Sequence, residues 1–184
     1  MIKQTSKRIL IIVFFAALVI SSSVFSGNKF NSNIAAQSTD TLTVLKPESQ
    51  YQMEEQLITS ILTRYHFKEF QINDSLSGLI FNRYFDVLDH GKNYFLSSDI
   101  ESFNPEKYQL DDKLFKGDVQ FYYDVFNVYL KRLNERMNYI DQLLNTEFDY
   151  SIDENYNYDR DKSDWAKNQT ELNELWRKRL KNDA

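Results

Sequence analysis

Apolar and aromatic side chains recur every three or four residues from Asp118 to Asn145, and this unbroken period limits the possible folds more than any other feature of the chain. Its members are Val119, Tyr122, Phe126, Tyr129, Leu130, Leu133, Met137, Ile140 and Leu144. At about 1.5 Å per residue, such a helix is roughly 42 Å long. No stretch alternates apolar and polar residues for long enough to predict a strand. The sequence therefore predicts an all-α fold, a helical bundle with one long helix at about 118–145.

Two shorter apolar periods predict helices before the long one. The first covers about Ser49 to Tyr65, with a stripe that consists of Met53, Leu57, Ile58, Ile61, Leu62 and Tyr65. The second begins at Asp74, a good N-cap, and Gly91 stops it. Its stripe consists of Leu76, Leu79, Ile80, Tyr84, Val87 and Leu88. Because residues three and four positions apart share one face of a helix, we expect these stripes to be buried against one another and against the long helix.

Capping signals predict short helical turns between the second helix and the long one. Ser98, followed by Glu101 three residues later, matches a capping box. Pro105 suits the first turn of a helix, where a missing N–H costs nothing. We therefore expect one or two helical turns from Ser98 and a restart near Pro105.

A last helix is predicted at about 169–181, with Asn168 and Glu171 as its capping pair. Its apolar face consists of Leu172, Leu175, Trp176 and Leu180. A polar, acidic loop over 146–168 separates it from the long helix. Isolated helices of this length are marginal in water. We expect this helix to be loosely docked, with Trp176 exposed to solvent.

The first 26 residues are typical of a secretory signal peptide. Lys3, Lys7 and Arg8 precede an apolar run from Ile9 to Ile20, which is too short to span a bilayer comfortably. We expect a signal peptide at 1–26, cleaved after Ser26, then a flexible tether at 27–47, and a location in the periplasm or cell envelope. An uncleaved anchor is the alternative, and it would be the only contact with a membrane.

Cysteine content and charge exclude several classes of function. The chain has no Cys, which rules out disulfides, thiolate nucleophiles and Cys-based zinc sites. Residues 27–184 carry 19 Lys and Arg against 27 Asp and Glu, a net charge of −8. Phosphate contacts need clustered Lys and Arg, so we expect no nucleic-acid partner.

The acid-rich stretch 153–176 has spacing that resembles a calcium-binding loop but lacks the residues that such a loop needs. Counted from Asp159, position 6 is Asp164 where Gly is required, and position 12 is Thr170 where Glu is required. The register that starts at Asn155 fails at the same two positions. We interpret this stretch as a connecting loop whose Tyr and Trp residues pack against neighbouring helices.

The remaining candidates for chemistry are two His residues and one pair of carboxylates. Asp86 lies one helical turn before His90 and could share a metal with it, but neither His90 nor His66 has a further ligand at a matching spacing. Asp111 and Asp112 could serve acid–base chemistry, but the dipole at a helix start explains them more simply. We therefore expect no catalytic residue, no metal site and no cofactor.

Three sequence blocks, in order, resemble the N-terminal helical region of the periplasmic tail-specific proteases, also called carboxy-terminal processing peptidases. The first contains "TRYHF", "IFNRYFDVLD" and "FLSSDIESF"; the second is "FYYDVFNVYLKRLNER"; the third is "YNYDRDKSDWAKNQTELNELW". The resemblance covers about residues 44 to 184. It implies an envelope serine peptidase with a Ser–Lys dyad and a PDZ domain that captures C-terminal tails. No position in this chain matches that dyad or that PDZ domain.

The resemblance leads to one expected organisation and one alternative. We expect residues 48–184 to be the helical N-terminal domain of such a protease, cut at Ala184. Its partners would be the PDZ and protease core and the C-terminal helical region of the same protein, with an envelope adaptor as a further candidate. The chain alone would be inactive. The alternative is a free-standing exported helical module that acts as an interaction or adaptor protein.

Overall fold

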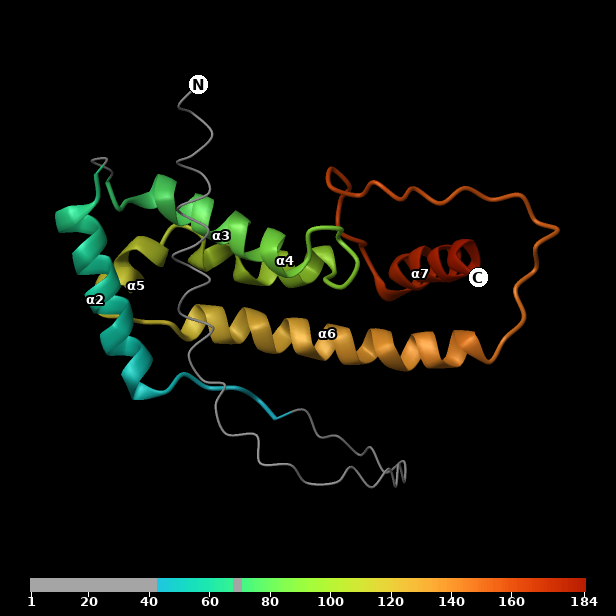
Figure 1. The fold of residues 1–184 in the computed structure, drawn as a ribbon, viewed down its shortest axis with the longest axis horizontal. Coiled ribbons are helices and arrows are strands. Elements are labelled where there is room, and N and C mark those ends of the chain that lie inside the picture. The colour runs from blue at the N-terminus through green and yellow to red at the C-terminus, as the bar shows by residue number, and fades with distance from the viewer. Residues whose placement is uncertain (1–42, 68–70) are drawn as a thin grey trace, which may run out of the picture. The chain divides into compact units, whose positions relative to one another are not determined.

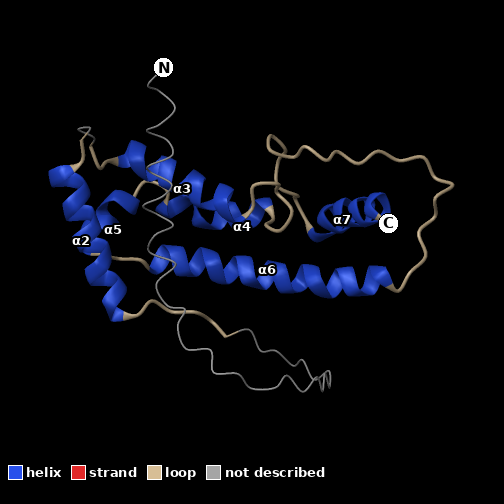
Figure 2. Cartoon of the chain, viewed as in Figure 1, coloured by secondary structure: helices blue, strands red, loops and turns tan. Residues whose placement is uncertain are grey.

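The computed structural model describes residues 43–67 and 71–184. Within these residues the chain is helical and contains no strand (Figures 1 and 2). The elements in chain order are α2 (Ser49–Tyr65), α3 (Asp74–Leu88), α4 (Ser97–Phe103), the 3-10 turn η1 (Asn104–Glu106), α5 (Leu110–Lys116), α6 (Gln120–Leu144) and α7 (Gln169–Asp183). The all-α prediction is confirmed.

The N-terminal predictions fall almost wholly outside the described residues. The predicted signal peptide at 1–26 and most of the predicted tether at 27–47 belong to this part of the chain. The end of the tether lies on α6, where Leu45 exchanges two backbone hydrogen bonds of 2.8 Å with the side-chain amide of Asn127. Among the described helices, none combines the length and the apolar character that crossing a membrane requires.

The main core forms where α3 and α5 meet the first half of α6 (Figure 1). Its buried members are Phe81, Phe85, Phe95, Leu110, Phe121 and Val125. The rings of Phe81 and Phe121 lie 5.8 Å apart, and Tyr84 donates a hydrogen bond of 2.9 Å to the carbonyl of Tyr122. Aromatic burial of this kind contributes a large share of the stability of a small domain. The first half of the predicted long helix therefore contributes Phe121 and Val125 to this core.

The buried face of α3 differs from the predicted stripe. Phe81 and Phe85 are buried, whereas Leu79 and Val87 of the predicted stripe are exposed. Ser77 is buried beside these rings because its hydroxyl donates a hydrogen bond of 2.7 Å to Asp111. The face with the two large rings and this hydrogen-bonded hydroxyl is therefore buried in preference to the face with Leu79 and Val87.

The buried face of α6 is likewise rotated from the prediction. Phe121, Val125 and Arg136 are its buried residues, while Met137 and Leu144 of the predicted stripe are exposed. The Arg136 guanidinium donates to Asn173 at 2.8 Å, and it lies over the Tyr139 ring, 5.0 Å from its centroid. Arg136 is therefore buried with one hydrogen-bond partner and an aromatic neighbour, while Met137 is 49% exposed.

Helix α2 has the predicted bounds, but the face that it buries is the one opposite the predicted apolar stripe. Its polar side faces the rest of the protein: Thr59 is buried, and Gln56 donates a hydrogen bond of 2.9 Å to the carbonyl of Lys116 at the end of α5. The predicted stripe faces away and is exposed. Gly117 makes this approach possible, because it adopts φ 68° and any Cβ there would collide with the carbonyl oxygen of Gln52.

Two predicted N-caps are each displaced. Asn73, not Asp74, caps α3 by accepting from the Leu76 N–H at 3.2 Å. At α4 the capping carboxylate is Asp99, which accepts from the Leu96 N–H at 2.9 Å, and not Glu101 after Ser98. Asp99 also binds Arg132 of α6 through two contacts of 2.8 Å, which holds the start of α4 against α6.

The end of α3 also differs from the prediction. The helix ends at Leu88 with Asp89 as its C-cap, three residues before Gly91. The residue with a positive φ in the following turn is Lys92, at 52°. The side chain of Asp89 accounts for this early end, because it binds the backbone of the turn that follows.

The last helix is docked, which corrects the expectation of a loose one. Its N-cap is confirmed, since Asn168 accepts from the Glu171 N–H at 3.0 Å. Leu172 and Trp176 are buried with Leu96 and Ala166 in a second core. Trp176 is 7% exposed, and its Nε1 donates a hydrogen bond of 2.7 Å to the carbonyl of Asn93. The turn after α3, which the sequence did not associate with α7, supplies the missing partner.

Candidate functional site

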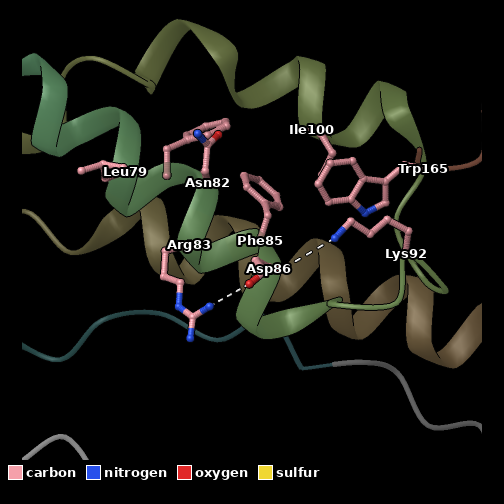
Figure 3. Close-up of a pocket in the computed structure, with 9 residues that line it drawn as sticks. Leu79, Asn82, Arg83, Phe85, Asp86, Lys92, Ile100 and Trp165 are labelled. Carbon is pink, nitrogen blue, oxygen red and sulfur yellow. Dashed lines mark hydrogen bonds and ion pairs between the residues drawn. The ribbon is translucent and has the colours of Figure 1, made fainter. Parts of the chain in front are cut away.

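An open groove lies between α3, α4 and the loop before α7 (Figure 3). It has a volume of about 490 Å³. Its lining consists of Leu79, Phe81, Asn82, Arg83, Phe85, Asp86, Lys92, Ile100 and Trp165. The rings of Phe81 and Phe85 belong to the main core, so the groove has a rigid apolar floor. Such a shape suits the side chains of another protein segment.

Charged residues form one rim of the groove, with Asp86 at their centre. Its carboxylate accepts from Arg83 at 2.8 Å, from His90 Nδ1 at 2.8 Å, and lies 3.5 Å from Lys92 Nζ (Figure 3). The hydrogen bond from His90 is the largest cause that lowers the pKa of Asp86. Lys92 Nζ also lies 5.2 Å from the centroid of the Trp165 ring, within the range of a cation–π contact. The rim therefore holds a fixed ionised carboxylate among three bases.

Side chains of the loop before α7 also contact this rim at His90 and at the backbone of Gly91. His90 Nε2 lies 3.0 Å from an oxygen of Asp161, and Arg160 Nε donates to the carbonyl of Gly91 at 3.0 Å. The hydrogen bond to Asp86, followed by the charge of Asp161, raises the pKa of His90. The prediction of a connecting loop whose Tyr and Trp residues pack on its neighbours is confirmed for Trp165, which contacts the main core, and is wrong for Tyr158, which is 82% exposed.

Beneath the groove, the buried carboxylate of Asp89 organises the turn after α3. It accepts from three backbone N–H groups, those of Asn93 at 2.6 Å, Tyr94 at 3.1 Å and Phe95 at 3.1 Å. Trp165 Nε1 donates to it as well, at 3.2 Å. Sequence reasoning missed Asp89. The available signal was an Asp directly after a helical stripe, where a carboxylate can bind the N–H groups of the next turn.

The candidate residues from the sequence are distributed over the chain. His66 lies at the C-terminus of α2, far along the chain from the His90 pair. Asp111 and Asp112 lie in the first turn of α5, as the dipole interpretation predicted, and Asp111 also binds Ser77.

The described residues contain no set of side chains that could bind a metal ion. Across 43–67 and 71–184, no group of three or more His, Asp or Glu side chains could hold a metal ion. In the acid-rich loop, Asp159 accepts from the Asp161 N–H at 3.3 Å, and Asp161 turns to His90.

Comparison with known proteins identifies the family of this chain. Residues 58–184 match the family of tail specific protease N-terminal domains. The chain belongs to the tail-specific protease family. A tail-specific protease from Haemophilus influenzae is 36% identical over 127 residues. That match covers 68% of this chain but 18% of the relative, so the chain spans less than a fifth of the relative's length.

The matched range contains both the groove and the turn that Asp89 organises. It begins within α2 and includes every helix from α3 to α7. The groove and the Asp89 turn are therefore features of a tail-specific protease N-terminal domain. The resemblance seen in the three sequence blocks is confirmed.

Proposed function

We propose that this chain is the N-terminal helical scaffold of an envelope tail-specific serine protease, which degrades or trims proteins from their C-terminus. The family match over residues 58–184 carries the proposal. The relative is much longer than the matched region, which fits a scaffold whose catalytic machinery resides elsewhere in the protein. In this proposal the chain itself supplies no catalytic residue, metal ligand or cofactor, and it is inactive alone.

The groove is the proposed seat for another part of the same protease. Its floor of Phe81 and Phe85 is fixed by the main core, so little side-chain entropy is lost when a partner segment binds. Arg83 and Asp86 on the rim offer both signs of charge for orientation. The partners in this proposal are the PDZ and protease core and the C-terminal helical region; an envelope adaptor protein is a further candidate.

A chimera tests the proposal directly. Residues 58–184 of this chain replace the matching region of the Haemophilus influenzae protease, and degradation of a protein with an apolar C-terminus is measured. We expect activity in the chimera and none from this chain alone. Leu79→Asp in the groove should reduce the activity of the chimera, whereas Leu144→Asp, an exposed change at the far end of α6, should not.

A folded chimera without activity would contradict the scaffold role. Turnover by the purified chain alone, after host proteases are removed, would contradict the proposed inactivity. Circular dichroism of each variant separates both results from simple unfolding.

Export to the envelope is part of the same proposal. Residues 1–26 have the charged start, apolar run and small-residue exit of a signal peptide. N-terminal sequencing of the exported protein should find a start near Gly27. A chain that still begins at Met1 would favour the anchor.

One observation favours the alternative of a free-standing interaction module. The described residues close two cores of their own, and Trp176 is buried within the second. A protein that folds alone in this way could serve as an adaptor. A chain that binds an intact tail-specific protease, but cannot replace its N-terminal domain in the chimera, would support that function.

A further inference from the structure

The outward side of α2 carries a group of apolar side chains that no described residue covers. The exposed fractions of its seven side chains run from 41% to 103%. They are Met53, Leu57, Ile58, Ile61, Leu62, Tyr65 and Phe67. Contiguous apolar surface of this kind marks an interaction site more often than chance exposure does.

Two charged residues lie in line with this apolar surface. Glu54, Leu57, Ile61 and Arg64 follow one another at intervals of three, four and three residues, which is the spacing of the seam of a two-helix coiled coil. Leu57 and Ile61 form the centre, and the two charges lie at opposite ends. No described residue makes an ion pair or a side-chain hydrogen bond with Glu54 or Arg64.

This order is self-complementary when two copies of the helix run antiparallel. Because the positions of Glu54 and Arg64 are symmetric about position 59, a two-fold axis there brings Glu54 of each copy opposite Arg64 of the other. The same axis brings each Leu57 opposite the Ile61 of the second copy. Closed two-fold symmetry of this kind is the commonest arrangement of protein dimers.

We propose that the outward side of α2 binds a second copy of this chain in an antiparallel, two-fold helix pair. In each layer a residue of one copy lies opposite a residue of the other. Glu54 lies opposite Arg64 in the two outer layers, Leu57 lies opposite Ile61 in the two central layers, and Tyr65 lies at the flank. A parallel pair is disfavoured because it would place Glu54 against Glu54 and Arg64 against Arg64. With only two central apolar layers, the contact is a weak one that charge directs. It does not rest on the proposed protease role.

The distribution of charge argues against a lipid surface as the occupant. Helices that lie in a membrane interface carry Lys and Arg on their polar face and a face free of acids toward the lipid. In α2 the acid Glu54 lies within the apolar seam, and Glu55 lies near Tyr122, where burial raises the pKa of Glu55. Arg64 is the one base of the helix. A protein partner that places a base opposite Glu54 fits this distribution of charge better than lipid acyl chains do.

Charge reversal in two separately tagged copies of the full chain tests the proposal. The association of the tags is measured by pull-down and by sedimentation at several concentrations and salt levels. Glu54→Arg and Arg64→Glu should each weaken self-association by roughly tenfold or more, because like charges then oppose each other in both outer layers. Mixing the two single variants should restore association, because each then carries one sign of charge at both ends of the seam. The double variant should also associate.

The matched control is Glu101→Arg, an exposed acid of α4 outside this surface, which should leave association unchanged. Both substituted residues are exposed and unpaired, so circular dichroism should show an unchanged fold. A chain that stays monomeric at all concentrations overturns the proposal, and so does binding of α2 to vesicles in place of self-association. Association that neither charge reversal weakens would also overturn the proposal. That result is expected if the apolar run 9–20 causes the association.

Discussion

Trp165 donates its indole N–H to the buried carboxylate of Asp89, 76 residues earlier in the chain, at a distance of 3.2 Å. The same carboxylate binds three backbone N–H groups of the turn that follows α3. One acid therefore connects the end of α3, the turn after it and the loop before α7. The two cores meet in that turn, since Phe95 belongs to the first and Leu96 to the second.

We expect Asp89→Ala to lower the free energy of unfolding by about 3–5 kcal/mol, because it leaves several buried N–H donors without an acceptor. Urea denaturation followed by Trp fluorescence measures this loss. Asp112→Asn, an exposed change on α5, is the control and should cost little. Equal stability of the Asp89 variant and the control would show that Asp89 does not organise the turn.

Trp176→Ala should cost about 3–5 kcal/mol, the range for a large aromatic residue removed from a core. Trp176→Phe keeps most of the packing but loses the 2.7 Å bond to the carbonyl of Asn93, so it should cost roughly 1 kcal/mol. Hydrogen exchange should show the amides of α7 as protected in the wild type and released by Trp176→Ala. Rapid exchange of α7 in the wild type would restore the expectation of a loosely docked helix.

Gly117→Ala should destabilise the protein by about 1–3 kcal/mol and release α2 from α5. The positive φ disfavours any side chain, and the added Cβ would collide with the carbonyl of Gln52. Gly91→Ala is the matched control: the Cβ there meets the side-chain end of Asn93, which can move, and the φ is not positive. Urea midpoints of the two variants should differ clearly, and similar midpoints would contradict the tight approach of α2.

Acid should loosen the contact between α7 and the loop before it. Arg177 and Lys181 both donate hydrogen bonds to Glu154 and lower its pKa to about 2 from 4.5. A carboxyl whose pKa is lowered by folding stabilises the protein above its unfolded value, and that stability is lost as the pH falls through the folded one. Melting temperature should therefore drop between about pH 4.5 and pH 2. Glu154→Gln should flatten this drop and Glu147→Gln, an exposed control, should not.

The contact between His90 and the loop should respond to pH in the opposite sense. Bonds to Asp86 and Asp161 raise the pKa of His90 above 6.5, so its contribution is complete below that pH and is lost as the pH rises through the folded value. An NMR titration of the His90 ring measures this pKa. Asp161→Asn should move it toward the ordinary value, while an unchanged titration would exclude the contact in solution.

The positions of the helices were predictable from the sequence because they depend on local chemistry. The bounds of α2 agree with the prediction at Ser49 and Tyr65, and α6 lies within the predicted 118–145. The cap of α7 at Asn168 was correct as well. Apolar period and capping are properties of neighbours along the chain, so an isolated sequence contains them.

The family was also readable from the sequence, whereas the surface that the family domain presents was not. Three sequence blocks indicated the tail-specific proteases, and residues 58–184 match that family. The groove depends on Trp165 arriving from a loop far along the chain to lie near Lys92 and Asp86. No local pattern specifies that meeting.

The sequence by itself determined which segments are helical and which side of α7 is buried, whereas only the tertiary structure decided the buried sides of α2, α3 and α6. On α2 the aliphatic stripe faces outward and Thr59 faces inward; on α6 Arg136 is buried while Met137 is exposed. The physical reason is that burial depends on the partners available in space. A polar group with a bonded partner can lie in a core, and an apolar group lies at the surface where no neighbouring element packs on it.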